Sequence, residues 1–333
     1  MKRRLPIGPV CILLPILLGC TAMPSIDAPT TDAPKDAVLS VVTVAPTNAV
    51  TFTPVPTPTP SPAPTDAPTS EPDGLIGWTV GGFCPLEETA VTDTSYTSDK
   101  VHLTVQTITD TETFSSKVTY FVIDLYIRDL SVLRTQAAKG FDRHTNGDFL
   151  DLCSDANALF AITGDYYGHH NHSFVVRNGT VYDTVSYSSW DVCVLYLDGS
   201  VELFANASLD INAVLDKGVW QIWQFGPILL DAEGKAITSF PKYNINPNNP
   251  RTVFGYYEPG HYCFVTIDGR QSGYSMGTTL KETAQLMERL GCTAAFNLDG
   301  GESAQLYWNG GVFNSPYDGG RELSDIIYIA AGA

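Results

Sequence analysis

The most informative segment of this sequence covers residues 279–303 and reads TLKETAQLMERLGCTAAFNLDGGES. Thr279 followed by Glu282 forms a capping box, and apolar residues recur on one face over residues 280–290. This pattern predicts a helix, and Gly291 is typical of the left-handed residue that ends one.

A second prediction comes from the end of the same segment. The apolar run over residues 293–298 predicts a buried strand, and Asp299 directly follows it. Gly300 and Gly301 then allow the backbone to approach a ligand closely, while the strand fixes where the acid points. This combination favours a functional site, although a loop carboxylate that caps backbone N–H groups is the alternative.

The rest of residues 74–333 predicts a domain built mainly from strands. We expect strands over residues 101–109, 117–127, 156–163, 173–177, 191–197, 201–204, 220–225 and 262–267. The dipeptides Asn178-Gly179, Asp198-Gly199 and Asn309-Gly310 predict hairpin turns, and two further helices are expected over residues 131–139 and 209–217. The predicted fold class is therefore α+β, a single domain with a mixed, mostly antiparallel sheet and a few packed helices.

The first 73 residues predict an export signal and a tether. Basic residues precede a short apolar run, which is typical of an export signal over residues 1–19 and too short to span a bilayer. Leu17-Leu18-Gly19-Cys20 resembles a bacterial lipobox, so Cys20 is expected to carry lipid and anchor the exported protein at the membrane. An ordinary signal peptide with an incidental cysteine is the alternative.

Residues 20–73 are interpreted as a disordered linker rich in proline and threonine. They contain 12 of the 22 prolines. A segment of this composition has too few apolar side chains to offset the entropy that is lost when a chain becomes ordered. This assignment leaves residues 74–333 as one domain.

The charge balance excludes a nucleic-acid partner. The chain has 333 residues, with 19 Lys and Arg against 36 Asp and Glu, and its formal net charge is −17. Proteins that neutralise a phosphate backbone need clustered basic side chains, which this sequence lacks. In such an acidic chain, arginines at strand ends are the natural contacts for a bound anion.

Two such arginines stand beside strand ends. Arg251 enters an apolar run after Pro250, and Arg270 follows Asp268-Gly269. A guanidinium placed in this way can hold a phosphate or carboxylate as a rigid fork. The alternative is that both arginines pair with Asp268 or Asp299 and only hold the loops together.

A histidine cluster raises the possibility of a metal site. His169, His170 and His172 follow Gly164-Asp165-Tyr166, where an acid after a buried strand is hard to explain by packing alone. No second group of ligands stands at a diagnostic spacing, and the cysteines show no CxxC pair. We therefore expect no metal or other cofactor, and we interpret three cysteines as core residues: Cys193, Cys263 and Cys292.

The order of these motifs resembles that of the phosphodiester glycosidase family. The similarity covers roughly residues 155–330 and is most specific over residues 251–316. Two departures stand out: this chain has Gly164-Asp165-Tyr166 where many members carry an Asn-Gly pair, and Glu302-Ser303-Ala304 where they carry a Gly-Ser-Ser run.

The resemblance implies a hydrolase that cleaves the glycosidic C–O bond of a sugar 1-phosphodiester, with a glycosyl phosphodiester or another phosphate-bearing glycan as its partner. Asp299 and Asp165, with Glu302 and Asp268 as alternates, are then the catalytic carboxylates, and Arg251 and Arg270 hold the phosphate. The other residues implied to contact substrate are Asn297, Gly300, Gly301, Ser303, Gly164 and Tyr166.

Two other functions remain open from the sequence. The changed Glu302-Ser303-Ala304 run favours a binding module for phosphate-bearing cell-surface glycans that no longer turns substrate over. The other open function is a metal-dependent hydrolase that uses the three histidines with Asp165. In that case, a chelator should abolish the activity.

Overall fold

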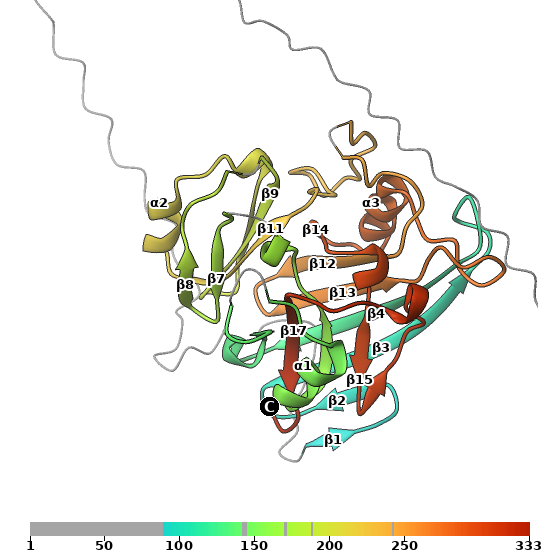
Figure 1. The fold of residues 1–333 in the computed structure, drawn as a ribbon, viewed down its shortest axis with the longest axis horizontal. Coiled ribbons are helices and arrows are strands. Elements are labelled where there is room, and N and C mark those ends of the chain that lie inside the picture. The colour runs from blue at the N-terminus through green and yellow to red at the C-terminus, as the bar shows by residue number, and fades with distance from the viewer. Residues whose placement is uncertain (1–88, 142–144, 170–171, 188, 242) are drawn as a thin grey trace, which may run out of the picture. The chain divides into compact units, whose positions relative to one another are not determined.

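This computed structural model describes residues 89–141, 145–169, 172–187, 189–241 and 243–333. These residues form three antiparallel sheets (Figure 1). The predicted export signal, Cys20 and the linker lie outside these ranges. Every pairing between the described strands is antiparallel. Together with the three short α-helices of the described ranges, this architecture confirms the predicted α+β class.

The largest sheet has seven strands and the other two have five each. In spatial order, the first contains β1 (Ala90–Val91), β2 (Ser95–Thr97), β3 (Val101–Asp110), β4 (Val118–Ile127), β13 (His261–Ile267), β12 (Arg251–Glu258) and β14 (Ala294–Leu298). The second contains β10 (Val201–Phe204), β9 (Asp191–Tyr196), β11 (Val219–Phe225), β7 (Val175–Arg177) and β8 (Thr180–Asp183). The third contains β16 (Gly311–Val312), β15 (Leu306–Trp308), β6 (Ala158–Thr163), β17 (Asp325–Ala330) and β5 (Arg134–Ala137).

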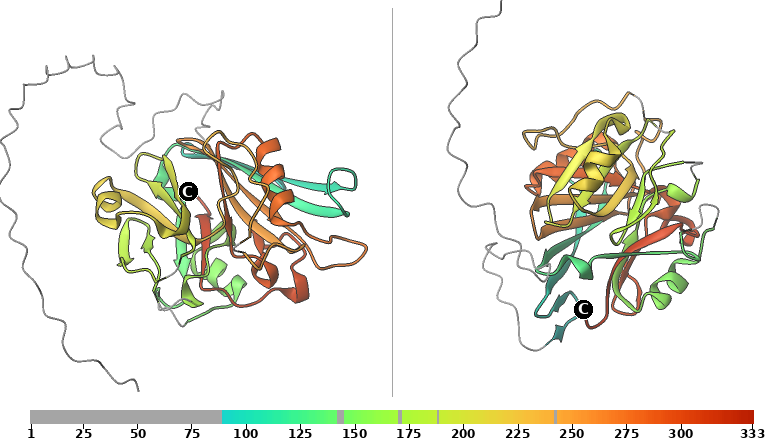
Figure 2. Two further views of the ribbon diagram at one scale, coloured as in Figure 1. Left: turned by 90° about the horizontal axis from the view of Figure 1, so that it is seen from above. Right: turned by 90° about the vertical axis from the view of Figure 1, so that its left-hand side faces the viewer.

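The main hydrophobic core lies where the inner faces of the three sheets meet. Phe264 of the large sheet, Trp223 of the second and Ile327 of the third all belong to this one buried cluster. Each helix covers the opposite face of one sheet: α3 (Leu280–Arg289) the first, α2 (Ile211–Asp216) the second and α1 (Phe149–Asp155) the third. Figures 1 and 2 show the three helices on the outside of the sheets.

The segment from 279 to 303 folds as its pattern predicts. The Thr279 side chain accepts from the Glu282 N–H and the Glu282 carboxylate accepts from the Thr279 N–H, which completes the capping box of α3. Gly291 adopts a φ of 82° after the helix, and β14 follows as a buried strand. The three predicted hairpin turns are also confirmed, since they join β7 to β8, β9 to β10 and β15 to β16.

One predicted helix is wrong. Residues 131–139 form the end of a 3₁₀ turn, η1 (Leu130–Val132), and then strand β5, which pairs with β17. In β5, residues alternate between half-buried and buried, as expected for a strand at a sheet edge. The pairing with a distant strand therefore overrides the helical propensity of this segment. Helix α1, begun by the Asp148 cap, was not predicted, whereas α2 confirms the helix expected over residues 209–217.

Four described cysteines, Cys153, Cys193, Cys263 and Cys292, are buried free thiols. This confirms the core assignment for the three that the sequence analysis named, and Cys84 lies outside the described residues. In the described part of the chain, no helix combines the length and the apolar character needed to cross a membrane.

Candidate active site

One pocket of about 500 Å³ collects many of the residues singled out in the sequence. We call it the arginine pocket because Arg251, Arg270 and Arg321 all line it. Its described lining consists of Tyr166, Trp190, Phe225, Asn244, Ile245, Asn249, Arg251, Arg270, Asn297, Asp299, Gly300, Gly301, Glu302 and Arg321. The two arginines and the glycine-flanked acid of the sequence analysis therefore converge on one cavity.

Two neighbouring strands of the large sheet place Arg251 and Asp299 at the same edge. In the antiparallel register Thr252 pairs with Leu298, so β12 begins where β14 ends. Asp299 follows β14 directly, and its N–H donates to the Gly164 carbonyl at 3.2 Å. A Cβ at Gly300 would lie 2.7 Å from the Pro250 carbonyl oxygen, so only glycine lets the loop turn this close to β12.

Asp299 is a mostly buried carboxylate with protein partners on both oxygens. Oδ1 accepts from the Gly300 N–H at 2.9 Å, and Oδ2 accepts from Arg321 Nη2 at 3.0 Å. Burial raises the pKa of Asp299 above its usual value, while Arg321 and a hydrogen bond from Ser303 oppose the rise. A carboxylate of raised basicity at a pocket wall is suited to accept a proton from water.

Arg321 is the residue of this site that sequence reasoning missed. Besides Asp299, its Nε donates to Ser303 Oγ at 2.5 Å, and its guanidinium lies 5.4 Å from the centre of the Tyr166 ring. The preceding residues, Gly319 and Gly320, both have positive φ angles. That Gly-Gly-Arg run was the available signal, because it marks a tight turn that presents a cation.

Arg251 carries a buried charge without a carboxylate partner among the described residues. Only 2% of the residue is exposed, and its guanidinium donates to backbone carbonyls: Thr278 at 3.0 and 3.1 Å, Ile245 at 2.7 Å and Pro247 at 2.8 Å. Burial, with a smaller effect of Arg270, lowers the pKa of Arg251 to about 9, which still leaves it charged at neutral pH. This uncompensated charge favours an anion in the pocket.

Arg270 is held at the open side of the pocket. Its Nε and Nη2 donate to Asn249 Oδ1 at 3.0 and 2.8 Å, and its guanidinium lies 5.3 Å from the centre of the Tyr317 ring. Nη1 is 3.8 Å from Glu302 Oε1. The carboxylate of Glu302, one of the alternate catalytic acids, therefore lies near the Arg270 guanidinium at the pocket rim.

Asn297 offers an acceptor at the base of the pocket. Its Nδ2 donates to the Gly226 carbonyl at 2.9 Å, but its buried Oδ1 has no donor within the described residues. A buried acceptor without a protein partner marks a place where an entering hydroxyl can donate.

Asp165 does not line the arginine pocket. Its side chain is fully buried and pairs with Arg177 Nη2 at 2.8 Å, while Arg177 Nε reaches Asp325 Oδ2 at 3.0 Å. Burial raises the pKa of Asp325 to about 7. Asp165 therefore belongs to a sealed ionic cluster, Asp165–Arg177–Asp325, and this geometry gives it a supporting position behind the site.

Gly164 and Tyr166 stand between the sealed cluster and the pocket. A Cβ at Gly164 would overlap Asp325 Oδ1, so this glycine is required by the cluster, while its carbonyl holds the Asp299 N–H. Tyr166 lines the pocket, and its ring stacks on His169 with 4.0 Å between centroids.

Asp268 and Ser303 also lie outside the pocket lining. Asp268 is 1% exposed and accepts from Tyr274, Asn314 and the Ser315 N–H, which fixes the turn before Arg270. Ser303 is fully buried and contributes through its bond to Arg321.

The described histidines point to different partners. His169 stacks on Tyr166, and His172 lies 3.2 Å from Asp183, while His170 is outside the described residues. Within the described chain, no three His, Cys, Asp or Glu side chains are grouped so that they could hold one metal ion.

Comparison with known proteins places the chain in a family. The family model described as phosphodiester glycosidase matches residues 156–330, which is 175 of the 333 residues. The chain belongs to the phosphodiester glycosidase family. This confirms the resemblance found in the sequence, and the matched segment contains all the described lining residues of the arginine pocket.

One curated relative matches part of this chain. The SPbeta prophage-derived uncharacterized protein YomE of Bacillus subtilis strain 168 is 31% identical over 160 residues, which are 46% of this chain and 25% of YomE. The chain thus spans about a quarter of that relative's length.

Two solved structures share the fold. The catalytic domain of zebrafish N-acetylglucosamine-1-phosphodiester alpha-N-acetylglucosaminidase, auto-inhibited by its pro-peptide, has a TM-score of 0.57 at 17% identity, and the match covers 73% of this chain and 88% of that domain. A hypothetical protein from Synechocystis has a TM-score of 0.51 at 13% identity, covering 70% of this chain and 62% of the other.

Proposed function

We propose that this protein hydrolyses the glycosidic C–O bond of a sugar 1-phosphodiester in the arginine pocket. One observation carries the proposal: three guanidinium groups and a carboxylate of raised pKa line one cavity of a chain whose net charge is −17. Family membership and the solved zebrafish relative, whose name describes a phosphodiester glycosidase, support the same reaction.

The arginines divide into two roles in this proposal. Arg251 and Arg270 attract the phosphate, because Arg251 has only carbonyl partners and Arg270 is weakly paired with Glu302. Arg321 orients Asp299 through their 3.0 Å hydrogen bond. A rigid array of donors stabilises charge where it develops in the transition state.

The proposed step needs one carboxylate and one water. The water oxygen bonds to the anomeric carbon, the C–O bond breaks, and its electron pair goes to the phosphate oxygen. The proton of the water passes to Asp299, while the departing phosphate monoester stays between the guanidinium groups. Its second pKa is about 6, so this leaving group departs at neutral pH without a strong acid to protonate it.

A labelling experiment tests the reaction. The purified chain is incubated with sugar 1-phosphodiesters of different sugars and anomers in H₂¹⁸O. We expect turnover with ¹⁸O in the released sugar, and we expect Asp299→Asn to lower kcat by about 10²–10⁴-fold. The matched control is Asp151→Asn, an exposed position on α1 that should leave kcat unchanged. Label in the phosphate, or inactivity of the wild type across the panel, contradicts the proposal.

A non-catalytic role remains the second candidate because of one feature. Both Asp299 oxygens already accept protein hydrogen bonds, an arrangement that also suits a fixed binding site. In this case the protein binds a phosphate-bearing glycan tightly and releases no product during long incubation. Any turnover that depends on Asp299 excludes it.

We also propose that residues 1–19 direct export, that lipid on Cys20 anchors the chain, and that residues 20–73 are a spacer for the domain from residue 74. The lipobox and the proline content of the spacer support this arrangement. Radioactive fatty acid fed to a bacterial host should label the full chain and not Cys20→Ala. Equal labelling of the two, or no labelling of the full chain, contradicts the anchor.

A further inference from the structure

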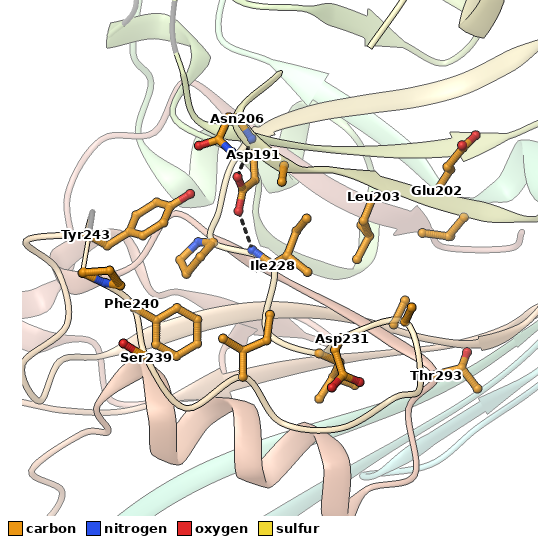
Figure 3. A pocket seen from close by; sticks show the side chains of 18 residues that line it. Asp191, Glu202, Leu203, Asn206, Ile228, Asp231, Ser239, Phe240, Tyr243 and Thr293 are labelled. Carbon is orange, nitrogen blue, oxygen red and sulfur yellow. Dashed lines mark hydrogen bonds between the residues drawn. The ribbon is translucent and has the colours of Figure 1, made fainter. Parts of the chain in front are cut away.

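A second pocket of about 580 Å³ lies next to the arginine pocket and has a different character. Its walls are mainly apolar side chains from β10, from the segment after β11 and from residues 237–243. Figure 3 shows the rings of Phe240 and Tyr243 on one side of this apolar pocket and Leu203 reaching in from the other. Its volume is within the range of small-molecule sites.

The three carboxylates of the apolar pocket already accept hydrogen bonds from the protein. Three carboxylates line it, and each accepts hydrogen bonds: Asp191 from the N–H groups of Asn206 and Ile228, Glu202 from Tyr196 and Lys217, and Asp231 from the N–H groups of Glu233 and Lys235. Among its described lining residues there is no lysine or arginine. The pocket thus repels anions and offers apolar surface to a neutral group.

A small cavity of about 90 Å³ borders both pockets. It shares Trp190, Phe225, Asn244 and Ile245 with the arginine pocket, and it shares Tyr243 with the apolar pocket. The Tyr243 hydroxyl bonds to Asp191, which fixes the ring at this junction. This small cavity, lined by the aromatic rings of Trp190, Phe225 and Tyr243, therefore adjoins both the arginine pocket and the apolar pocket.

We propose that the apolar pocket binds the alcohol part of the phosphodiester substrate, and that this alcohol is uncharged and apolar. The inference rests on the proposed function, which places the phosphate and the sugar in the arginine pocket. The reverse placement is unfavourable, because a sugar in the apolar pocket would bury several hydroxyls against mainly apolar walls. A phosphate there would face three carboxylates. The substrate class is thus a sugar 1-phosphate esterified to an apolar alcohol.

Binding of alkyl phosphates tests the assignment without any turnover. Calorimetry with octyl phosphate and methyl phosphate on the full chain should show at least about tenfold tighter binding of octyl phosphate, since each buried methylene contributes to affinity. Leu203→Asp should remove this preference. Leu197→Asp is the matched control, because Leu197 is 53% exposed at the end of the same hairpin and should keep the preference.

A second variant guards against a folding defect at Leu203. Ser239 is exposed and lines the apolar pocket, so Ser239→Trp fills the cavity from a loop position. We expect it also to remove the octyl preference while methyl phosphate binds as in wild type. Equal affinity for the two phosphates in wild type overturns the proposal, as does an octyl preference that survives both variants.

Turnover separates this inference from the proposed function. With octyl and methyl esters of one sugar 1-phosphate, the octyl ester should have a KM at least about tenfold lower in wild type and not in Ser239→Trp. Hydrolysis of both esters with equal KM overturns the apolar-alcohol assignment and leaves the hydrolase proposal standing. Octyl phosphate binding that depends on Leu203 and Ser239, with neither ester hydrolysed, refutes hydrolysis and supports the pocket assignment.

Discussion

Two sets of aspartate and arginine lie close together in this protein and differ in their access to solvent. In the sealed cluster, the side chains of Asp165, Arg177 and Asp325 are all 0% exposed. In the open pair, the side chain of Arg321 is 37% exposed and that of Asp299 is 11% exposed. The same residue types thus serve two purposes, and burial decides between them: the sealed cluster joins two sheets, while the open pair faces a cavity.

The largest expected effect comes from breaking the sealed cluster. Arg177→Met leaves two buried carboxylates without their cation, and we expect a loss of about 3–5 kcal/mol in the free energy of unfolding. Urea denaturation measures this loss. Arg321→Met is the matched control and should lose less than about 1 kcal/mol, because its ion pair is partly exposed. Equal losses of unfolding free energy in the two variants would contradict the different contributions to stability that we assign to the sealed cluster and the open pair.

Substitutions in the open pair should change catalytic activity. Arg321→Met removes the donor that orients Asp299 and leaves its carboxylate free to turn, so we expect kcat on a sugar 1-phosphodiester to fall about 10²-fold. Arg321→Lys should recover part of the loss, since it restores a charge but not the two-pronged contact with Ser303 and Asp299. Unchanged kcat in Arg321→Met would argue against an orienting role.

The pH dependence of stability tests the sealed cluster in a second way. Burial raises the pKa of Asp325 to about 7, whereas the unfolded chain has a value of about 3.9. The folded state then binds more protons between these values, so stability from this group is full below about pH 4 and is lost as pH rises toward 7. Asp325→Asn should flatten this part of the curve of unfolding free energy against pH. Parallel curves for the variant and the wild type would contradict the assignment.

The smallest effect is expected at the pocket rim. Glu302 is 3.8 Å from Arg270, and both side chains are well exposed, so Glu302→Gln should change stability by less than about 0.5 kcal/mol. Removing this carboxylate frees Arg270 for phosphate, so KM should fall by a factor of about two to five. High salt should reduce the difference in KM. A rise in KM, or a large loss of kcat, would instead assign Glu302 a direct part in the reaction.

Local patterns predicted the segment around α3 and β14 well. Capping, periodicity and the glycine after the helix are properties of adjacent residues, and they placed Asp299 at a strand end. Arg251 and Arg270 were found in the same way, since each stands next to a turn residue at the border of a strand. The convergence of all three on one pocket follows from the register of β12, β13 and β14.

What the sequence could not predict depends on contacts between distant residues. Arg177 and Asp325 are 148 positions apart, so nothing local showed that Asp165 would be sealed behind the site instead of lining it. Arg321 reaches Asp299 from 22 positions later in the chain, beyond strands β15 and β16. The wrong helix over residues 131–139 has the same origin, because β5 exists only through its pairing with β17.

The shared edge of β12 and β14 limits how this scaffold can diversify. Because one hydrogen-bonded ladder sets the spacing between the Arg251 and Asp299 positions, exchanging surface loops cannot lengthen or shorten it. Residues 226–250, in contrast, contribute walls to all three cavities and carry no group of the proposed reaction step. Directed evolution toward new leaving groups should therefore accumulate its substitutions in that connection, while the bond that is cut stays the same.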